Sequence, residues 1–206
     1  MKAYPPVAAI FVDVGGVLLT NGLDHGQRAQ LVAKFGLDGA DFEGRHQMLS
    51  SALDAGQIDL DQYLDRTIFC RPRTFDKQEV RDFIYALSQA LPGSLALIGR
   101  IAKAGRVFLA TLNNESRELN LHRIETFGLR NYFSAFFSSC YLGVSKPHRE
   151  IYQLALDISQ RQAEECVFID DRPLNLECAR QLGLHTIQFL SAPQLENDLR
   201  LLGLEF

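Results

Sequence analysis

Acidic side chains follow two apolar runs in this sequence. Residues 7–12 are six consecutive apolar residues that lead into Asp13, and residues 166–169 lead into Asp170-Asp171. An unpaired carboxylate inside a buried strand is very costly, so we expect these acids at the open carboxyl ends of their strands. Adjacent carboxylates at one strand end repel each other unless a cation lies between them. The pattern therefore predicts a cation site.

The same acids could carry nucleophilic chemistry. A carboxylate such as Asp13 can attack phosphorus and form an aspartyl phosphate, which divides hydrolysis into two easier steps. A divalent cation and a lysine offset the repulsion between carboxylate and phosphate. Lys146 precedes a proline that begins a predicted helix, and Thr111 follows a third apolar run, residues 107–110. Taken singly, Thr111 reads as a strand-end polar residue and Lys146 as a solvated loop lysine.

Four short motifs occur in a characteristic order. Asp13, Thr111, Lys146 and Asp170-Asp171 together resemble the motifs of the haloacid dehalogenase (HAD) superfamily of hydrolases, over essentially the whole chain. The chain is most similar to subfamily I, with a helical C1 cap, and to its α-glucose-1-phosphatase-like branch, in which Gly also occurs at the position of Gly15. The resemblance implies that Asp13 is the nucleophile and that Thr111 and Lys146 contact the phosphate. It also implies Mg²⁺ held by Asp13, the Gly15 carbonyl, Asp170 and Asp171.

Further substrate contacts are expected in the loop after Thr111. That loop comprises Leu112, Asn113 and Asn114, and both asparagines also suit an ordinary turn. Asn175 follows the late acidic pair and could orient one of its carboxylates.

The chain departs from the family pattern two residues after the nucleophile. Most phosphatases of this superfamily carry a second Asp there as general acid and base, where this chain has Gly15, and Leu112 replaces a usual Asn. A general acid contributes about 10²–10⁴-fold in rate. The substrate could have a good leaving group, such as an anomeric or acyl phosphate. Alternatively the cap could supply the acid, from His25, His46 or Asp24, or catalysis could be weak.

The order of apolar patterns predicts an α/β fold, a Rossmann-like doubly wound parallel sheet with an inserted four-helix cap. Residues 24–91 change from strand-like runs to helical periodicity, whereas helices and strands alternate from residue 92 onward. We expect a core domain at 1–16 and 92–206, and a cap domain at 17–91. A cap of this kind closes the cleft and selects the substrate.

The composition and charge limit the kinds of molecule that this protein could bind. Among 206 residues the net charge is −4 and no basic run stands out, which argues against nucleic acid. The four cysteines are widely spaced, which favours neither disulfides nor zinc and suits a reducing, cytoplasmic location. The N-terminal residues 1–16 read as neither a signal peptide nor a membrane span. The expected partner is a small-molecule phosphate ester, without a membrane.

The sequence thus predicts a Mg²⁺-dependent phosphatase that acts on a small phosphorylated metabolite, such as a sugar phosphate. A 2-haloacid dehalogenase is the nearest alternative; it needs no metal, and the Asp170-Asp171 pair would repel its acidic substrate. A catalytically weak phosphate-binding or interaction protein on the same scaffold is another alternative. A two-component receiver domain is set aside because its acidic pair comes first in the chain. A phosphomutase would need the acid and base that Gly15 lacks.

Overall fold

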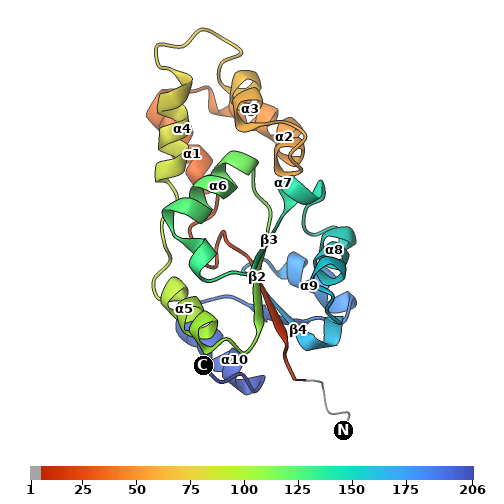
Figure 1. The fold of residues 1–206 in the computed structure, drawn as a ribbon. Helices are drawn as coiled ribbons and strands as arrows, with labels where there is room; N and C mark the ends of the chain where they lie inside the picture. Colours follow the sequence, from red (N-terminus) through yellow and green to blue (C-terminus); the bar gives the residue numbers. More distant parts are fainter. Residues whose placement is uncertain (1–5) are drawn as a thin grey trace.

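A five-stranded parallel sheet forms the centre of the protein, seen here in a computed structural model that describes residues 6–206 (Figure 1). The first five residues of the expected core segment lie outside the described residues. The strand order is β3-β2-β1-β4-β5. The strands are β1 (Ala9–Val12), β2 (Phe108–Asn113), β3 (Ala135–Ser138), β4 (Cys166–Asp170) and β5 (His185–Gln188). All four residues of the central β1 are fully buried, which explains its unbroken apolar sequence.

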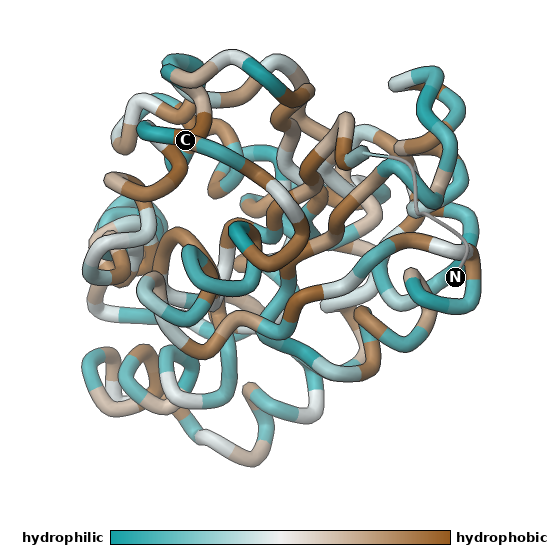
Figure 2. The backbone as a smooth tube through the Cα atoms, turned by 90° about the horizontal axis from the view of Figure 1, so that it is seen from below, coloured by the Kyte–Doolittle hydropathy of each residue, from teal (hydrophilic) through white to brown (hydrophobic). Residues whose placement is uncertain are grey.

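Helices cover both faces of the sheet, so the predicted doubly wound α/β fold is confirmed (Figure 1). One face packs against α5 (Ser94–Ala104), α6 (Arg117–Thr126) and α10 (Ala192–Leu201). The other packs against α8 (Arg149–Ser159) and α9 (Pro173–Gln181). Three short elements complete this part: η1 (Leu129–Asn131), α7 (Ser139–Leu142) and η2 (Ala163–Glu165). Figure 2 shows hydrophobic and hydrophilic residues alternating along the outer helices, as expected for elements that bury one side.

Four helices between β1 and α5 form a separate group, which we call the helical lobe. They are α1 (His25–Phe35), α2 (Gly39–Asp54), α3 (Leu60–Thr67) and α4 (Lys77–Ala86). The lobe has its own apolar cluster and lies beyond the carboxyl ends of the strands (Figure 1). Each helix begins directly after an Asp whose carboxylate accepts a backbone N–H of the first turn. Asp59 and Asp76 also form capping boxes with Gln62 and Glu79, in which each partner accepts the backbone N–H of the Asp.

Two paired segments connect the lobe to the sheet. The Thr20 amide donates to the carbonyl of Gln89 (2.8 Å), and the Leu91 amide donates to the carbonyl of Leu18 (2.9 Å). Residues 17–19 pack in the apolar cluster of the sheet, so the chain leaves the core only after them. The lobe is therefore held at two adjacent points, directly above the strand ends.

Within residues 6–206, the helices are all too short or too polar to cross a membrane.

Candidate functional site

Three carboxylates meet at the carboxyl edge of the sheet. Because β1 and β4 pair in parallel with Val12 opposite Ile169, the residues that follow, Asp13 and Asp170, emerge side by side. Asp13, Asp170 and Asp171 each have an oxygen within 4.8 Å of the others. Asp13 is 7% exposed and Asp170 is fully buried. The structure therefore brings together the acids on which the sequence-based hypothesis depended.

Lys146 lies between these carboxylates. Its Nζ is 3.0 Å from Asp13 Oδ2 and 2.6 Å from Asp170 Oδ2. The loop that carries it, between α7 and α8, is held by the side chain of Asn114. The amide nitrogen of Asn114 donates to the Lys146 carbonyl and its oxygen accepts the Lys146 N–H, both at 2.8 Å. The lysine is thus a fixed, buried positive charge rather than a solvated one.

Asp170 and Asp171 differ in the hydrogen bonds that their carboxylates accept. The Asp170 carboxylate accepts the Arg172 amide (2.8 Å) and the Asn175 side-chain amide (3.0 and 3.1 Å) in addition to Lys146. In contrast, Asp171 Oδ1 is buried with no hydrogen-bond partner among the described residues. A buried oxygen without a partner is costly, so Asp171 is the acid with a coordination position to offer. Asp170 serves to hold Lys146 and Asn175.

Burial changes the proton affinities here. It raises the pKa of Asp13 to about 7, although the Lys146 ammonium opposes the shift. Burial and the neighbouring Asp170 raise the pKa of Asp171. Burial alone would lower the pKa of Lys146, but Asp13 and Asp170 outweigh it and raise the pKa. Asp13 and Asp171 thus retain protons more readily than free carboxyls, which a bound divalent cation would reverse.

The donor set fits Mg²⁺. The ion takes hard oxygen ligands and keeps several waters, so two carboxylates and a carbonyl suffice. Asp13 and Asp171 present such oxygens, and Gly15 lies at the same edge. Gly16, at φ +77°, passes so close that a Cβ there would lie 2.3 Å from Asp171 Oδ2. Only glycine allows the Asp171 carboxylate its position.

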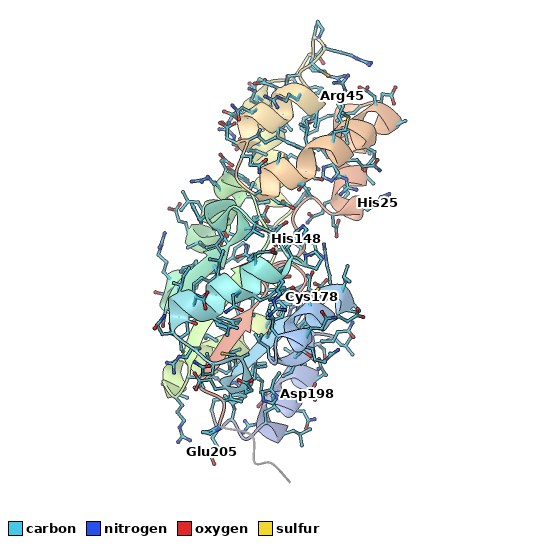
Figure 3. The ribbon with its side chains drawn as sticks, turned by 90° about the vertical axis from the view of Figure 1, so that its right-hand side faces the viewer. His25, Arg45, His148, Cys178, Asp198 and Glu205 are labelled. Carbon is cyan, nitrogen blue, oxygen red and sulfur yellow. The ribbon has the colours of Figure 1, made fainter. Side chains whose placement is uncertain are left out.

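A cavity of about 300 Å³ opens above this edge. Its floor includes Asp13, Asn114, Lys146 and Asn175. Its roof comes from the lobe and the segment leading into it, and the lining there is mostly polar: Leu23, Asp24, His25, Arg28, His46, Ser50, Leu53 and Asp54. Figure 3 shows His25 at the end of the lobe next to the sheet and Arg45 near the far end. The cavity thus lies at the joint between sheet and lobe.

The expected phosphate loop is only partly in this cavity. Asn114 lines the cavity, whereas Thr111, Leu112 and Asn113 are not among its lining residues. The Thr111 hydroxyl is fully buried, without a partner among the described residues. The Asn113 side chain is used internally: its amide donates to Asn120 (3.1 Å) and its oxygen accepts the Ser138 hydroxyl (3.0 Å). Thr111, Leu112 and Asn113 all belong to β2, and their side chains are buried between the layers of the fold.

Gly15 lies next to Arg123, which forms a buried ion pair with Glu115. A Cβ on Gly15 would lie 3.1 Å from Asn21 Oδ1 and 3.7 Å from a guanidinium nitrogen of Arg123. Arg123 in turn contacts Glu115 at 3.0 Å and donates to Ser88 Oγ and the Thr20 carbonyl, both at 3.1 Å. It therefore connects the loop after β2 with both segments that lead to the lobe. The periodicity of apolar residues in the sequence does not reveal the pairing of Arg123 with Glu115.

The three acid candidates expected from the cap all line the cavity, but each is differently placed. Asp24 Oδ1 accepts a hydrogen bond from the backbone N–H of Gln27 and so caps α1. The His25 side chain is exposed. His46 Nδ1 lies 2.8 Å from the Tyr63 hydroxyl. Sequence reasoning missed Asp54, another lobe acid that lines the cavity.

Comparisons with known proteins show similarity to one family of hydrolases. The family model of haloacid dehalogenase-like hydrolases matches residues 7–183. Flavin mononucleotide hydrolase 1 from Arabidopsis thaliana is 30% identical over 162 residues, which span 79% of this chain and 65% of the plant protein. A HAD-like hydrolase structure from Porphyromonas gingivalis is 25% identical with a TM-score of 0.74, covering 95% of this chain and 99% of that one. A HAD family enzyme from Bacteroides thetaiotaomicron, in complex with magnesium and inorganic phosphate, has the same fold (18% identity, TM-score 0.75, coverage 88% and 93%).

Proposed function

Since this chain belongs to the haloacid dehalogenase-like hydrolases, we propose that it is a Mg²⁺-dependent phosphatase that hydrolyses a small phosphorylated metabolite through an aspartyl phosphate. The observation that carries the proposal is the contact of one buried lysine with two carboxylates beneath a mostly polar cavity. Lys146 contacts Asp13 and Asp170 there, and Asp171 completes a cluster of acids suited to a divalent ion.

Each residue of the cluster has one task in this reaction. Asp13 attacks phosphorus from the floor of the cavity, with its other oxygen fixed by the Val14 amide at 2.7 Å. Lys146 binds the phosphoryl oxygens as a point charge, and Asn114 keeps its loop in place. Mg²⁺, when bound, supplies charge that offsets the repulsion between the carboxylate and the phosphate. Asp13, the Gly15 carbonyl and Asp171 would hold it, while Asp170 orients Lys146.

The helical lobe is proposed as the cap that selects the substrate. Two apolar side chains, Leu23 and Leu53, line the cavity among many polar ones, which favours a hydroxyl-rich leaving group such as a sugar. The plant relative is named as a flavin mononucleotide hydrolase, so that ester belongs in any substrate survey.

Purified protein should therefore be assayed against sugar phosphates, flavin mononucleotide, a simple alkyl phosphate and 4-nitrophenyl phosphate, with Mg²⁺ and with EDTA. We expect phosphate release that requires Mg²⁺. Asp13→Asn should abolish turnover and leave the fold intact. Asp65→Asn removes an equally charged but exposed lobe carboxylate paired with Lys77 (2.7 Å) and should behave as wild type.

Three results would contradict the proposal. Retained turnover in Asp13→Asn would exclude Asp13 as the nucleophile. Chloride release from a 2-chloro acid that persists in EDTA would favour a dehalogenase. Failure to cleave any ester, including the aryl phosphate, would favour a non-catalytic phosphate-binding protein.

A further inference from the structure

Hydrolysis through an aspartyl phosphate needs a proton donor and a proton acceptor beyond the residues assigned so far. The first step releases an alkoxide, which must gain a proton, and the second step needs a water that loses one. Asp13 is occupied as nucleophile and Lys146 as a permanent cation, and Asp171 is committed to the metal. Another titratable group in the cavity must therefore move the proton. This reasoning rests on the proposed function.

Most other titratable groups of the cavity are already engaged. Asp24 caps α1, and His46 is bonded to the Tyr63 hydroxyl. Burial, the largest effect, and then the nearby Arg28 lower the pKa of His46. Glu115 is held by Arg123 at 3.0 Å. Each of these three already has a hydrogen bond or an ion pair that fixes its side chain in place.

Apart from the arginines, two titratable side chains of the lining have no hydrogen bond or ion pair among the described residues. His25 is exposed at the start of α1, which leaves Asp54. It lines the cavity from the last position of α2 and is only partly buried. No hydrogen bond or ion pair reaches its carboxylate from any residue that the structure describes. Its backbone, in contrast, is fixed to the sheet layer, because its carbonyl accepts the Ser139 hydroxyl at 2.6 Å. Two residues later, Gly56 (φ +66°) lies against Cys140, whose carbonyl oxygen would be 2.2 Å from a Cβ. The backbone of Asp54 is thus fixed where the lobe meets the sheet, while its carboxylate has no partner among the described residues.

The charges around Asp54 favour a carboxyl that can exchange a proton near neutrality. Burial, the largest effect, and the Glu115 carboxylate together raise its pKa to about 7, against the opposing Arg172 guanidinium. Burial raises the pKa of the Tyr63 hydroxyl of α3, and the Asp54 carboxylate adds to that rise. Glu115 therefore has a second effect besides its ion pair: its negative charge disfavours a second charge on Asp54.

We propose that Asp54 is the general acid and base of this enzyme. In the first step Asp13 forms a bond to phosphorus, the ester P–O bond breaks, and the protonated Asp54 carboxyl gives its proton to the leaving oxygen, which departs as an alcohol. In the second step the Asp54 carboxylate takes a proton from water as the water oxygen bonds to phosphorus and the bond between phosphorus and the Asp13 oxygen breaks. Hydrogen phosphate leaves, and Asp13 and Asp54 return to their starting states.

The test compares Asp54→Asn with the exposed control Asp65→Asn on two substrates. An alkyl phosphate needs a proton on its leaving oxygen, whereas 4-nitrophenyl phosphate releases a stabilised phenolate without one. Asp54→Asn should lower turnover of the alkyl phosphate by about 10²–10⁴-fold. With the aryl phosphate it should give a rapid burst of about one nitrophenolate per active site, followed by slow turnover, because water attack on the aspartyl phosphate then lacks its base.

The wild-type enzyme provides a second, independent measurement. Its kcat/KM for the alkyl phosphate should fall as pH rises above about 7, because Asp54 then loses the proton that it must donate. The aryl phosphate should not show this fall. This profile decides the matter even if Asp54→Asn does not fold.

The outcomes separate the two proposals. If wild-type protein cleaves esters and Asp13→Asn does not, but Asp54→Asn matches Asp65→Asn on both substrates, the role of Asp54 is refuted and the phosphatase stands. Loss of the aryl burst in folded Asp54→Asn also refutes it, since that step needs no acid. If wild-type protein cleaves no ester, the phosphatase proposal itself fails.

Discussion

Replacing Gly16 with Ala tests the metal site through one contact. Gly16 has φ +77°, and an added Cβ would lie 2.3 Å from Asp171 Oδ2 and 2.5 Å from its Cγ. No side chain fits at such distances, so the Asp171 carboxylate must move. The substitution therefore displaces a proposed metal ligand without changing any ligand chemically.

Two contributions to the effect can be separated. An alanine in the left-handed region costs about 1–2 kcal/mol wherever it occurs. Gly105, the C-cap of α5 at φ +63°, has no atom within 4 Å of its would-be Cβ, so Gly105→Ala reports this strain alone. Disturbing the support of a metal ligand typically weakens the metal about 10–100-fold. At saturating Mg²⁺, that lowers the metal's stabilisation of the fold by about 1.4–2.7 kcal/mol.

The assay is urea unfolding of wild type and both variants across a series of Mg²⁺ concentrations. Without metal Gly105→Ala should lose about 1–2 kcal/mol, and Gly16→Ala at least as much, because its Cβ also displaces Asp171. Gly105→Ala should then gain as much from Mg²⁺ as wild type does, whereas the gain of Gly16→Ala should be smaller by about 1.4–2.7 kcal/mol. If Mg²⁺ raised the free energy of unfolding of Gly16→Ala by as much as it does for wild type, this would falsify the assignment of Asp171 as a ligand. The absence of any increment in the wild-type protein would remove the metal site altogether.

Three further variants probe other groups. Thr111→Val should lower turnover, because Thr111 is expected to contact the phosphate, yet unfold with equal or about 1 kcal/mol higher free energy, because it removes a buried hydroxyl without a partner among the described residues; unchanged turnover would remove Thr111 from the site. Arg123→Met should cost about 3–5 kcal/mol in urea unfolding, because it leaves Glu115 buried and unpaired, and a loss below about 1 kcal/mol would show that solvent reaches that carboxylate. Asp54→Asn should stabilise the protein at pH 8 but not at pH 4. The folded pKa, about 7, exceeds the ordinary 3.8, so wild-type stability falls as pH rises between these values, by at most about 4 kcal/mol. Thermal unfolding at both pH values measures this, and an equal gain at pH 4 would contradict the titration argument.

The sequence by itself determined the elements and most of the acidic cluster. The apolar run at residues 7–12 predicts a strand buried on both faces, which the structure has at Ala9–Val12, and the Asp-initiated helices carry their own start signals. Parallel pairing then places the ends of β1 and β4 at one edge, so Asp13 and Asp170 must meet there. These are consequences of local pattern and of a short list of permitted topologies.

Only the tertiary structure decided which other polar groups reach the cavity. From the sequence, Thr111 and Asn114 are both expected near the phosphate. In the structure the Thr111 hydroxyl is buried in β2, whereas the Asn114 side chain lines the cavity and holds the Lys146 loop. Asp54 became a candidate because Ser139 fixes the end of α2 at the joint. Arg123 reaches both connecting segments from α6. Such contacts depend on how the lobe is placed on the sheet, a geometry set by packing between segments far apart in the chain, which periodicity does not encode.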